Sequence, residues 1–210
     1  MHSSTKPFVV SLQGPHGVGK STLLHQLRSC FPEAVFCDET AERLENKKQP
    51  EGELLEAEVF AANQRMFISA EIARWRSFND KELVIMDRGP ETTEFFTLHY
   101  SEFKEANFDS EQLLSDELRS LRECRSSLLL YLTASPDQLF SRADADAKPR
   151  PTFSRWLHFF EPKAASWFRQ FPSCQHIDTT HRSPEAIKTL AFDMILNALM
   201  QFNAEDLNAI

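Results

Sequence analysis

The stretch Gly14-Pro15-His16-Gly17-Val18-Gly19-Lys20-Ser21 matches the pattern G-x-x-x-x-G-K-[ST] at every fixed position. The apolar run Phe8–Leu12 precedes it, and the segment Ser21–Cys30, which favours a helix, follows it. The chain has five glycines, and three of them fall within this stretch. Such a concentration indicates unusual backbone dihedrals or the close approach of a ligand at this point.

Between a strand and a helix, this pattern predicts a loop that binds a nucleoside triphosphate. Glycines let successive backbone N–H groups surround the β-phosphate, and the N-terminus of the following helix adds partial positive charge. Lys20 is expected to reach the β- and γ-phosphates, and the Ser21 hydroxyl to bind Mg²⁺. The predicted cofactors are ATP and Mg²⁺, and GTP remains open as an alternative donor. The residues expected to contact the nucleotide are Gly14, Pro15, His16, Gly17, Val18, Gly19, Lys20, Ser21 and Thr22.

Composition narrows the class of protein further. The length of 210 residues suits one domain, and 41% hydrophobic and 26% charged residues are ordinary for a globular protein. The net charge of −8 argues against a nucleic-acid-binding surface, which needs clustered Lys and Arg. No apolar run approaches the roughly 20 residues of a membrane span. The four cysteines show neither CxxC nor metal-site spacing, so we expect a cytoplasmic protein with reduced thiols.

Short apolar runs alternate with helical segments along the chain. The runs with strand character are Phe8–Leu12, Ala34–Cys37, Leu83–Met86, Leu128–Leu132 and Gln175–Ile177. Their near-continuous apolar character suits strands that are covered on both faces of a parallel sheet. Helices are predicted over Ser21–Cys30, Leu54–Phe78, Asp109–Cys124 and Ala186–Met200, with Ser-Pro helix openings at Ser135 and Ser183. The sequence therefore predicts an α/β fold, a single three-layer domain over residues 1–210 with a five-stranded parallel sheet flanked by helices.

The segments after the loop differ from two classes of nucleotide-binding protein. A GTPase would carry [NT]-K-x-D after a later strand, whereas the strand ending at Leu132 continues as Thr133–Asp137. A motor or AAA-type ATPase usually carries an acidic pair after a strand, and here Asp87 is followed by Arg88.

Several segments carry a resemblance to a known group, from about Val9 to Leu196. They are Asp87-Arg88, Thr133-Ala134-Ser135-Pro136-Asp137 with Leu139 and Arg142, and His176-Ile177-Asp178-Thr179 before Ser183-Pro184-Glu185. Together with the loop they resemble the deoxynucleoside kinase and thymidylate kinase group of P-loop kinases. Asp87–Phe95 also resembles small AAA-type ATP-binding proteins and ribosylnicotinamide kinases.

The resemblance implies the P-loop NTPase fold with a short lid at about residues 141–152. It also implies an ATP- and Mg²⁺-dependent kinase that acts on a nucleoside or a related small molecule. A nucleoside monophosphate kinase and a regulatory ATPase without a small-molecule acceptor are the alternatives. The phosphoryl acceptor and a possible homodimer remain open.

The resemblance assigns roles to residues at strand ends. Glu39 would be the general base, with Asp38 as the alternative. Arg88 would steady the phosphoryl acceptor or donor, and Asp87 would hold Mg²⁺ or the acceptor hydroxyl. A carboxylate at a strand end lies at the usual ligand edge of an open α/β sheet.

Further candidates lie on predicted helices and in the predicted lid. Gln64 would read the acceptor base through its amide, although an exposed glutamine beside core aromatics fits the pattern equally well. Arg142, Lys148 and Arg150 would offset the charge of the transferring phosphoryl group. The aromatic residues between Phe153 and Phe171 are predicted to pack in the core rather than to bind a ligand. The catalytic candidates are Lys20, Glu39, Arg88 and Arg142; the acceptor candidates Asp38, Gln64, Asp87, Arg88 and Arg150; the metal ligands Ser21 and Asp87.

Overall fold

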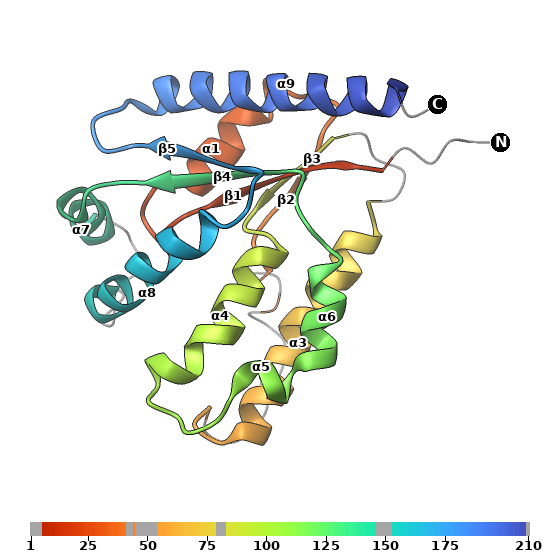
Figure 1. Cartoon of the computed structure of the whole chain (residues 1–210). Helices are drawn as coiled ribbons and strands as arrows, with labels where there is room; N and C mark the ends of the chain where they lie inside the picture. Colours follow the sequence, from red (N-terminus) through yellow and green to blue (C-terminus); the bar gives the residue numbers. More distant parts are fainter. Residues whose placement is uncertain (1–5, 41–43, 45–53, 79–82, 146–152, 209–210) are drawn as a thin grey trace.

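Parallel strands form a sheet in the order β2-β3-β1-β4-β5 in the computed structural model (Figure 1), which describes residues 6–40, 44, 54–78, 83–145 and 153–208. The strands are β1 (Phe8–Gln13), β2 (Val35–Cys37), β3 (Leu83–Asp87), β4 (Leu128–Thr133) and β5 (Cys174–Asp178). Strand β1 lies in the middle, paired with β3 on one side and β4 on the other. Every residue of β1 is buried, because helices cover both faces.

Helices form the two outer layers (Figure 1). They are α1 (Lys20–Leu27), α3 (Ala57–Arg76), α4 (Pro90–Phe103), α5 (Ser110–Leu113), α6 (Ser115–Arg122), α7 (Pro136–Asp144), α8 (Phe153–Phe168) and α9 (Pro184–Asn208). Helices α1 and α9 pack together over one face, against Phe8, Val10 and Leu12 of β1. On the other face, Trp75 and Phe78, in and just after α3, pack against Val9. The predicted three-layer α/β fold is confirmed.

The predicted helix Asp109–Cys124 is wrong in one respect, because the structure has two helices there. The Asp109 side chain caps α5 by accepting hydrogen bonds from two backbone N–H groups. At Leu114 the backbone leaves the helical region, with φ −126° and ψ 28°. Leu114 is fully buried against Phe60, Leu118 and Leu121, so tertiary packing overrides the continuous apolar periodicity.

Other boundaries also differ from those predicted. Helix α9 continues to Asn208, beyond the predicted end at Met200, and α4 and α8 were not assigned as helices from periodicity. Of the predicted lid, residues 146–152 lie outside the described residues. None of the described helices combines the length and the apolar character needed to cross a membrane.

A buried ion pair fixes the ends of two strands. The side chains of Arg74 and Glu71 are 2% and 3% exposed, with 2.7 Å between Arg74 Nη2 and Glu71 Oε2. The Arg74 guanidinium also donates to the carbonyl oxygens of Asp38 (2.8 Å) and Arg88 (3.1 Å). Those carbonyls directly follow β2 and β3, so helix α3 positions the two strand ends through one side chain.

Replacing Arg74 should therefore destabilise the fold. Arg74→Met leaves the Glu71 carboxylate buried without a countercharge and should lower the free energy of unfolding by about 3–5 kcal/mol. The double variant Glu71→Met/Arg74→Met should recover a large part of that loss, because no buried charge then remains. Urea denaturation measures both changes.

The matched control is Arg119→Met, because Arg119 and Asp116 form an ion pair at the same helical spacing on the surface, 75% and 82% exposed. It should change the free energy of unfolding by less than about 1 kcal/mol. An Arg74→Met variant as stable as the wild type would contradict the structural role of the buried pair.

Candidate active site

The phosphate loop joins the end of β1 to the start of α1 through backbone conformations that favour glycine. Gly14 and Gly19 have φ values of 130° and 103°, which L side chains rarely adopt. At Gly14, a Cβ atom would also lie only 2.3 Å from the carbonyl oxygen of Leu132 in β4. The loop can therefore pass over the end of the neighbouring strand only with glycine at this position.

Lys20 lies inside this loop. Its side chain is largely buried, and Nζ donates to the carbonyl oxygens of Gly14 (3.2 Å) and Pro15 (3.0 Å). An ammonium group held by neutral carbonyls can exchange them for phosphate oxygens, which are stronger partners because they are charged.

A hydroxyl and a carboxylate meet where the loop faces β3. Ser21 Oγ donates to Asp87 Oδ2 at 2.7 Å. Asp87 is buried, and its Oδ1 makes no hydrogen bond within the part of the chain that the structure describes. An unsatisfied carboxylate oxygen beside a serine hydroxyl suits a hard cation such as Mg²⁺, which would take its remaining ligands from water and phosphate oxygens. Ser21 and Asp87 therefore fit a magnesium ion.

Arg88 and Glu39 form an ion pair beside the loop, with 3.0 Å between Arg88 Nε and Glu39 Oε1. Arg88 has a φ of 56°, in the left-handed region, which is strained for a residue with a side chain. Its backbone N–H donates to the carbonyl of Leu12, and its own carbonyl accepts from Arg74. These bonds hold the strained turn, and the guanidinium lies 5.6 Å from the ring centre of Phe96.

A wide hollow of about 430 Å³ opens along the outer side of the loop. His16 to Leu23 line it, together with Arg142 and Arg182. Arg142 donates to the carbonyl and the hydroxyl of Thr179, both at 3.1 Å, and to the carbonyl of Val18 at 3.4 Å. The size and the two arginines suit the donor nucleotide.

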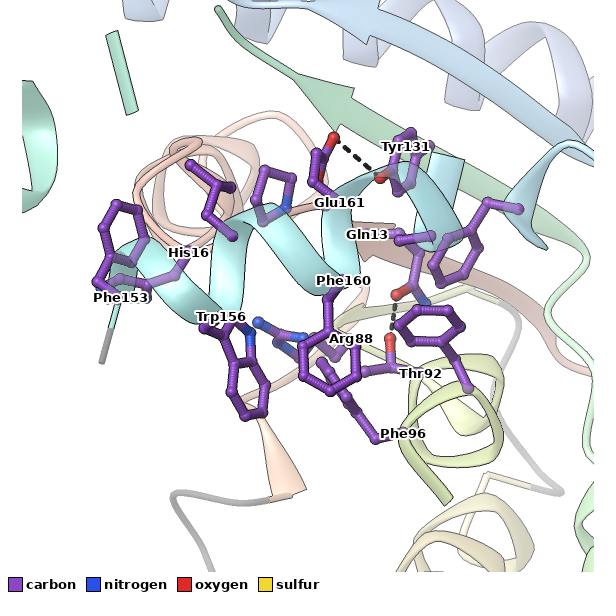
Figure 2. A pocket seen from close by; sticks show the side chains of 16 residues that line it. Gln13, His16, Arg88, Thr92, Phe96, Tyr131, Phe153, Trp156, Phe160 and Glu161 are labelled. Carbon is purple, nitrogen blue, oxygen red and sulfur yellow. Dashed lines mark hydrogen bonds between the residues drawn. The ribbon is translucent and has the colours of Figure 1, made fainter. Parts of the chain in front are cut away.

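A second, narrow hollow borders the first residues of the loop, Gly14 to His16 (Figure 2). It holds only about 30 Å³ of free space, enough for one or two water molecules. Its aromatic walls are Phe95 and Phe96 of α4, Tyr131 of β4, and Phe153, Trp156, Phe160 and Phe168 of α8. Its polar side chains include Gln13, Arg88, Thr92 and Glu161.

Two hydrogen-bonded pairs lie in this narrow hollow. Thr92 Oγ1 donates to Gln13 Oε1, and the Tyr131 hydroxyl donates to Glu161 Oε1 at 3.3 Å. Burial raises the pKa of the Glu161 carboxyl to about 7, against the opposing effects of the Tyr131 hydrogen bond and the positive charge of Lys20. Burial raises the pKa of Tyr131 far above its ordinary range as well, helped by the nearby Glu161 charge.

Residues 9–172 match a family model described as an AAA domain. The chain belongs to this AAA domain family. No curated protein matches it in sequence. Its fold is similar to that of thymidylate kinase from Candida albicans, with a TM-score of 0.66 and 13% sequence identity over 91% of this chain and 92% of that chain. The expected P-loop NTPase fold of the nucleotide kinase group is therefore confirmed.

The structure brings most of the predicted site residues of this AAA-domain protein together. Ser21 and Asp87 meet, Glu39 meets Arg88, and Thr22 lines the wide hollow together with residues His16 to Ser21 of the loop. Arg142 lies on the donor side. Lys148 and Arg150 lie outside the described residues.

Besides Asp87, which meets Ser21, two acceptor candidates line neither hollow. Asp38 is exposed and forms an ion pair with Arg28 at 3.8 Å. Gln64 is buried between α3 and α4, where its Oε1 accepts from Thr97 at 2.9 Å. Their predicted roles remain predictions.

Several residues of the two hollows were missed by sequence reasoning. They are Gln13, Thr92, Tyr131, Glu161 and Arg182. Signals were present for two of them, because Tyr131 interrupts the apolar run of β4 and Glu161 is the only acidic residue of α8. The aromatic residues from Phe153 to Phe171 do pack in the core, as predicted, but four of them also line the narrow hollow.

Asp87→Asn tests the magnesium assignment. The amide can still accept from Ser21 but binds a divalent cation weakly, so the Mg²⁺ concentration for half-maximal ATP turnover should rise about 10–100-fold. A magnesium titration at fixed ATP measures this. An unchanged magnesium requirement would remove Asp87 from the site. As a control, Asp116→Asn on the surface of α6 should leave the titration unaltered.

Proposed function

We propose that this AAA-domain protein is an ATP- and Mg²⁺-dependent kinase that phosphorylates a hydroxyl group of a nucleoside or a closely related small molecule. The arrangement of the two hollows supports it, since one borders Gly14–His16 of the phosphate loop, the other borders His16–Ser21, and the two share His16. A hollow lined with aromatic rings suits a flat organic ring. Its position beside the loop suits a second substrate that meets the γ-phosphate of the first.

The chain's residues would act by positioning and by charge. The loop and Lys20 would hold the phosphates, while Ser21 and Asp87 would hold Mg²⁺, which neutralises phosphate charge when bound. Arg88 lies between the loop and the aromatic walls, where it can offset charge on the transferring group. Arg142, on the donor side, would steady the nucleotide, and the family resemblance assigns proton acceptance to Glu39.

A monophosphate acceptor fits the narrow hollow less well. Arg88 is the only Arg or Lys among the described residues that line it, and Glu39 already pairs with its guanidinium. The phosphate group of a monophosphate acceptor would need unpaired cations or backbone N–H groups around it.

A regulatory ATPase without a small-molecule acceptor is the second candidate, and one observation favours it. The free space of about 30 Å³ in the narrow hollow admits water and no larger acceptor unless the aromatic walls move apart. In that case water would be the natural acceptor of the phosphate.

An acceptor screen separates the two candidates. ATP consumption is measured with Mg²⁺ alone and with each member of a panel of nucleosides, nucleoside monophosphates and nicotinamide riboside, with GTP as an alternative donor. A kinase should consume ATP many times faster with at least one acceptor and form a phosphorylated product. Slow hydrolysis that no acceptor accelerates would favour the regulatory ATPase.

Lys20→Ala tests the nucleotide site itself. Loss of the ammonium removes a charged contact to the β- and γ-phosphates, so turnover should fall by about 10²–10³-fold. The fold should survive, because the Lys20 ammonium donates to carbonyl oxygens of the loop itself, those of Gly14 and Pro15. Lys188→Ala, at an ion pair on α9, is the matched control and should keep wild-type turnover. Unchanged turnover of the Lys20 variant would rule out the kinase.

A further inference from the structure

We propose that Glu161 of α8, rather than Glu39, accepts the proton of the acceptor hydroxyl during phosphate transfer, while Glu39 holds Arg88 in place. This proposal rests on the proposed kinase function. It assigns a catalytic role to a residue that no motif in the sequence marks.

The position of Glu161 supports the proposal. Its side chain lines the narrow hollow together with Gly14 and Pro15 of the phosphate loop and with Arg88 (Figure 2). One carboxylate oxygen, Oε1, accepts from the Tyr131 hydroxyl at 3.3 Å. The described residues form no hydrogen bond to the other oxygen, Oε2, which leaves it able to accept from a substrate hydroxyl.

Glu39 is placed differently. Its Oε1 lies 3.0 Å from Arg88 Nε, and the residue does not line the narrow hollow. Drawing Glu39 toward an acceptor hydroxyl would release the guanidinium that has to meet the phosphoryl group. The ion pair therefore suits Glu39 for orienting Arg88.

The charge around Glu161 suits a proton acceptor. Burial raises its pKa to about 7, and a general base works best when its pKa lies near the operating pH. The positive charge of Lys20 in the loop and the hydrogen bond from Tyr131 of β4 act on it directly, and His16 of the loop and Arg88 of the turn after β3 are the other titratable or charged side chains that line the hollow with it. From α4 the hollow receives only Thr92 and two phenyl rings.

The acceptor hydroxyl oxygen forms a bond to the γ-phosphorus of ATP, and the bond from that phosphorus to the bridging oxygen breaks, so that ADP leaves with the electron pair. The hydroxyl proton passes to Glu161 and later to solvent. An anionic phosphate at the same place would be repelled by the carboxylate, so the inferred acceptor is an uncharged hydroxyl compound rather than a monophosphate.

The kinetic test uses Glu161→Gln, which keeps the shape and the bond from Tyr131. Thymidine, cytidine, adenosine and guanosine serve as probes at saturating MgATP between pH 5.5 and 8.5. In the wild type, kcat/KM for the acceptor should fall about tenfold per pH unit below about 7. In the variant kcat should be lower by about 10²-fold or more, and the KM for MgATP should change little. The decrease of kcat/KM below pH 7, which is the acid limb of the profile, should be absent.

A control variant and a Glu39 variant are measured in the same way. Glu102→Gln, an exposed glutamate that pairs with Lys163 of α8, is the matched control and should keep the wild-type profile. Loss of the acid limb in Glu39→Gln but not in Glu161→Gln would overturn the proposal in favour of Glu39. Wild-type activity that no probe accelerates would instead refute the kinase on which the proposal rests.

Thermal unfolding supplies a readout without substrate. The pKa of Glu161 is about 7 in the folded protein against an ordinary 4.5. Between these values the unfolded chain has lost the proton that the folded protein keeps, so ionisation of Glu161 costs stability as the pH rises from about 4.5 to about 7. The Tm of Glu161→Gln minus the Tm of the wild type should therefore increase from about pH 4.5 to about pH 7 and stay constant above pH 7. A difference that does not change with pH would contradict the buried, titrating carboxyl.

Discussion

The contact between Gly14 and the carbonyl oxygen of Leu132 sets the position of the whole site. Because no Cβ atom fits there, the chain can leave β1 and cross the end of β4 at backbone distance. Strand β1 lies between β3 and β4, so this crossing places the phosphate loop at the centre of the carboxyl edge of the sheet. Asp87 and Thr179, which end or follow strands on either side of the loop, then face it as well.

Two buried carboxylates of α4 tie this helix to α6 and to the segment before β4. Glu91 accepts from the backbone N–H (2.7 Å) and hydroxyl of Ser126 just before β4, and burial raises its pKa. Glu94 pairs with Arg122 and Arg125. These carboxylates find partners within the protein. Asp87 and Glu161 differ from them, because each keeps one oxygen with neither a hydrogen bond nor an ion pair among the described residues. The contrast separates groups that support the fold from groups open to a ligand.

The sequence made the phosphate loop far easier to recognise than the narrow hollow beside it. The loop motif works through its own backbone, so its geometry is local and readable from spacing. The walls of the narrow hollow come instead from α4, β4 and α8, which are distant in sequence. Periodicity placed Gln64 on a helix face but could not show that the Thr97 hydroxyl of α4 would donate a hydrogen bond to its amide oxygen. Glu161 stands between phenylalanine and proline, and only the packing of α8 against the loop brings it into the site.

The narrowness of the second hollow has a mechanical consequence under the proposed function. Phe96 of α4 meets Trp156 and Phe160 of α8 at ring separations of 5.2 and 5.1 Å, and the same Phe96 ring lies beside the guanidinium of Arg88. An acceptor ring that enters here must separate these aromatic side chains. Because Phe96 supports Arg88 on one side and Glu39 holds it on the other, displacing that ring changes the environment of the cation that faces the phosphoryl group. Under the proposed function, acceptor entry would therefore be coupled to the position of Arg88, and this coupling would restrain phosphate transfer to water while no acceptor is present.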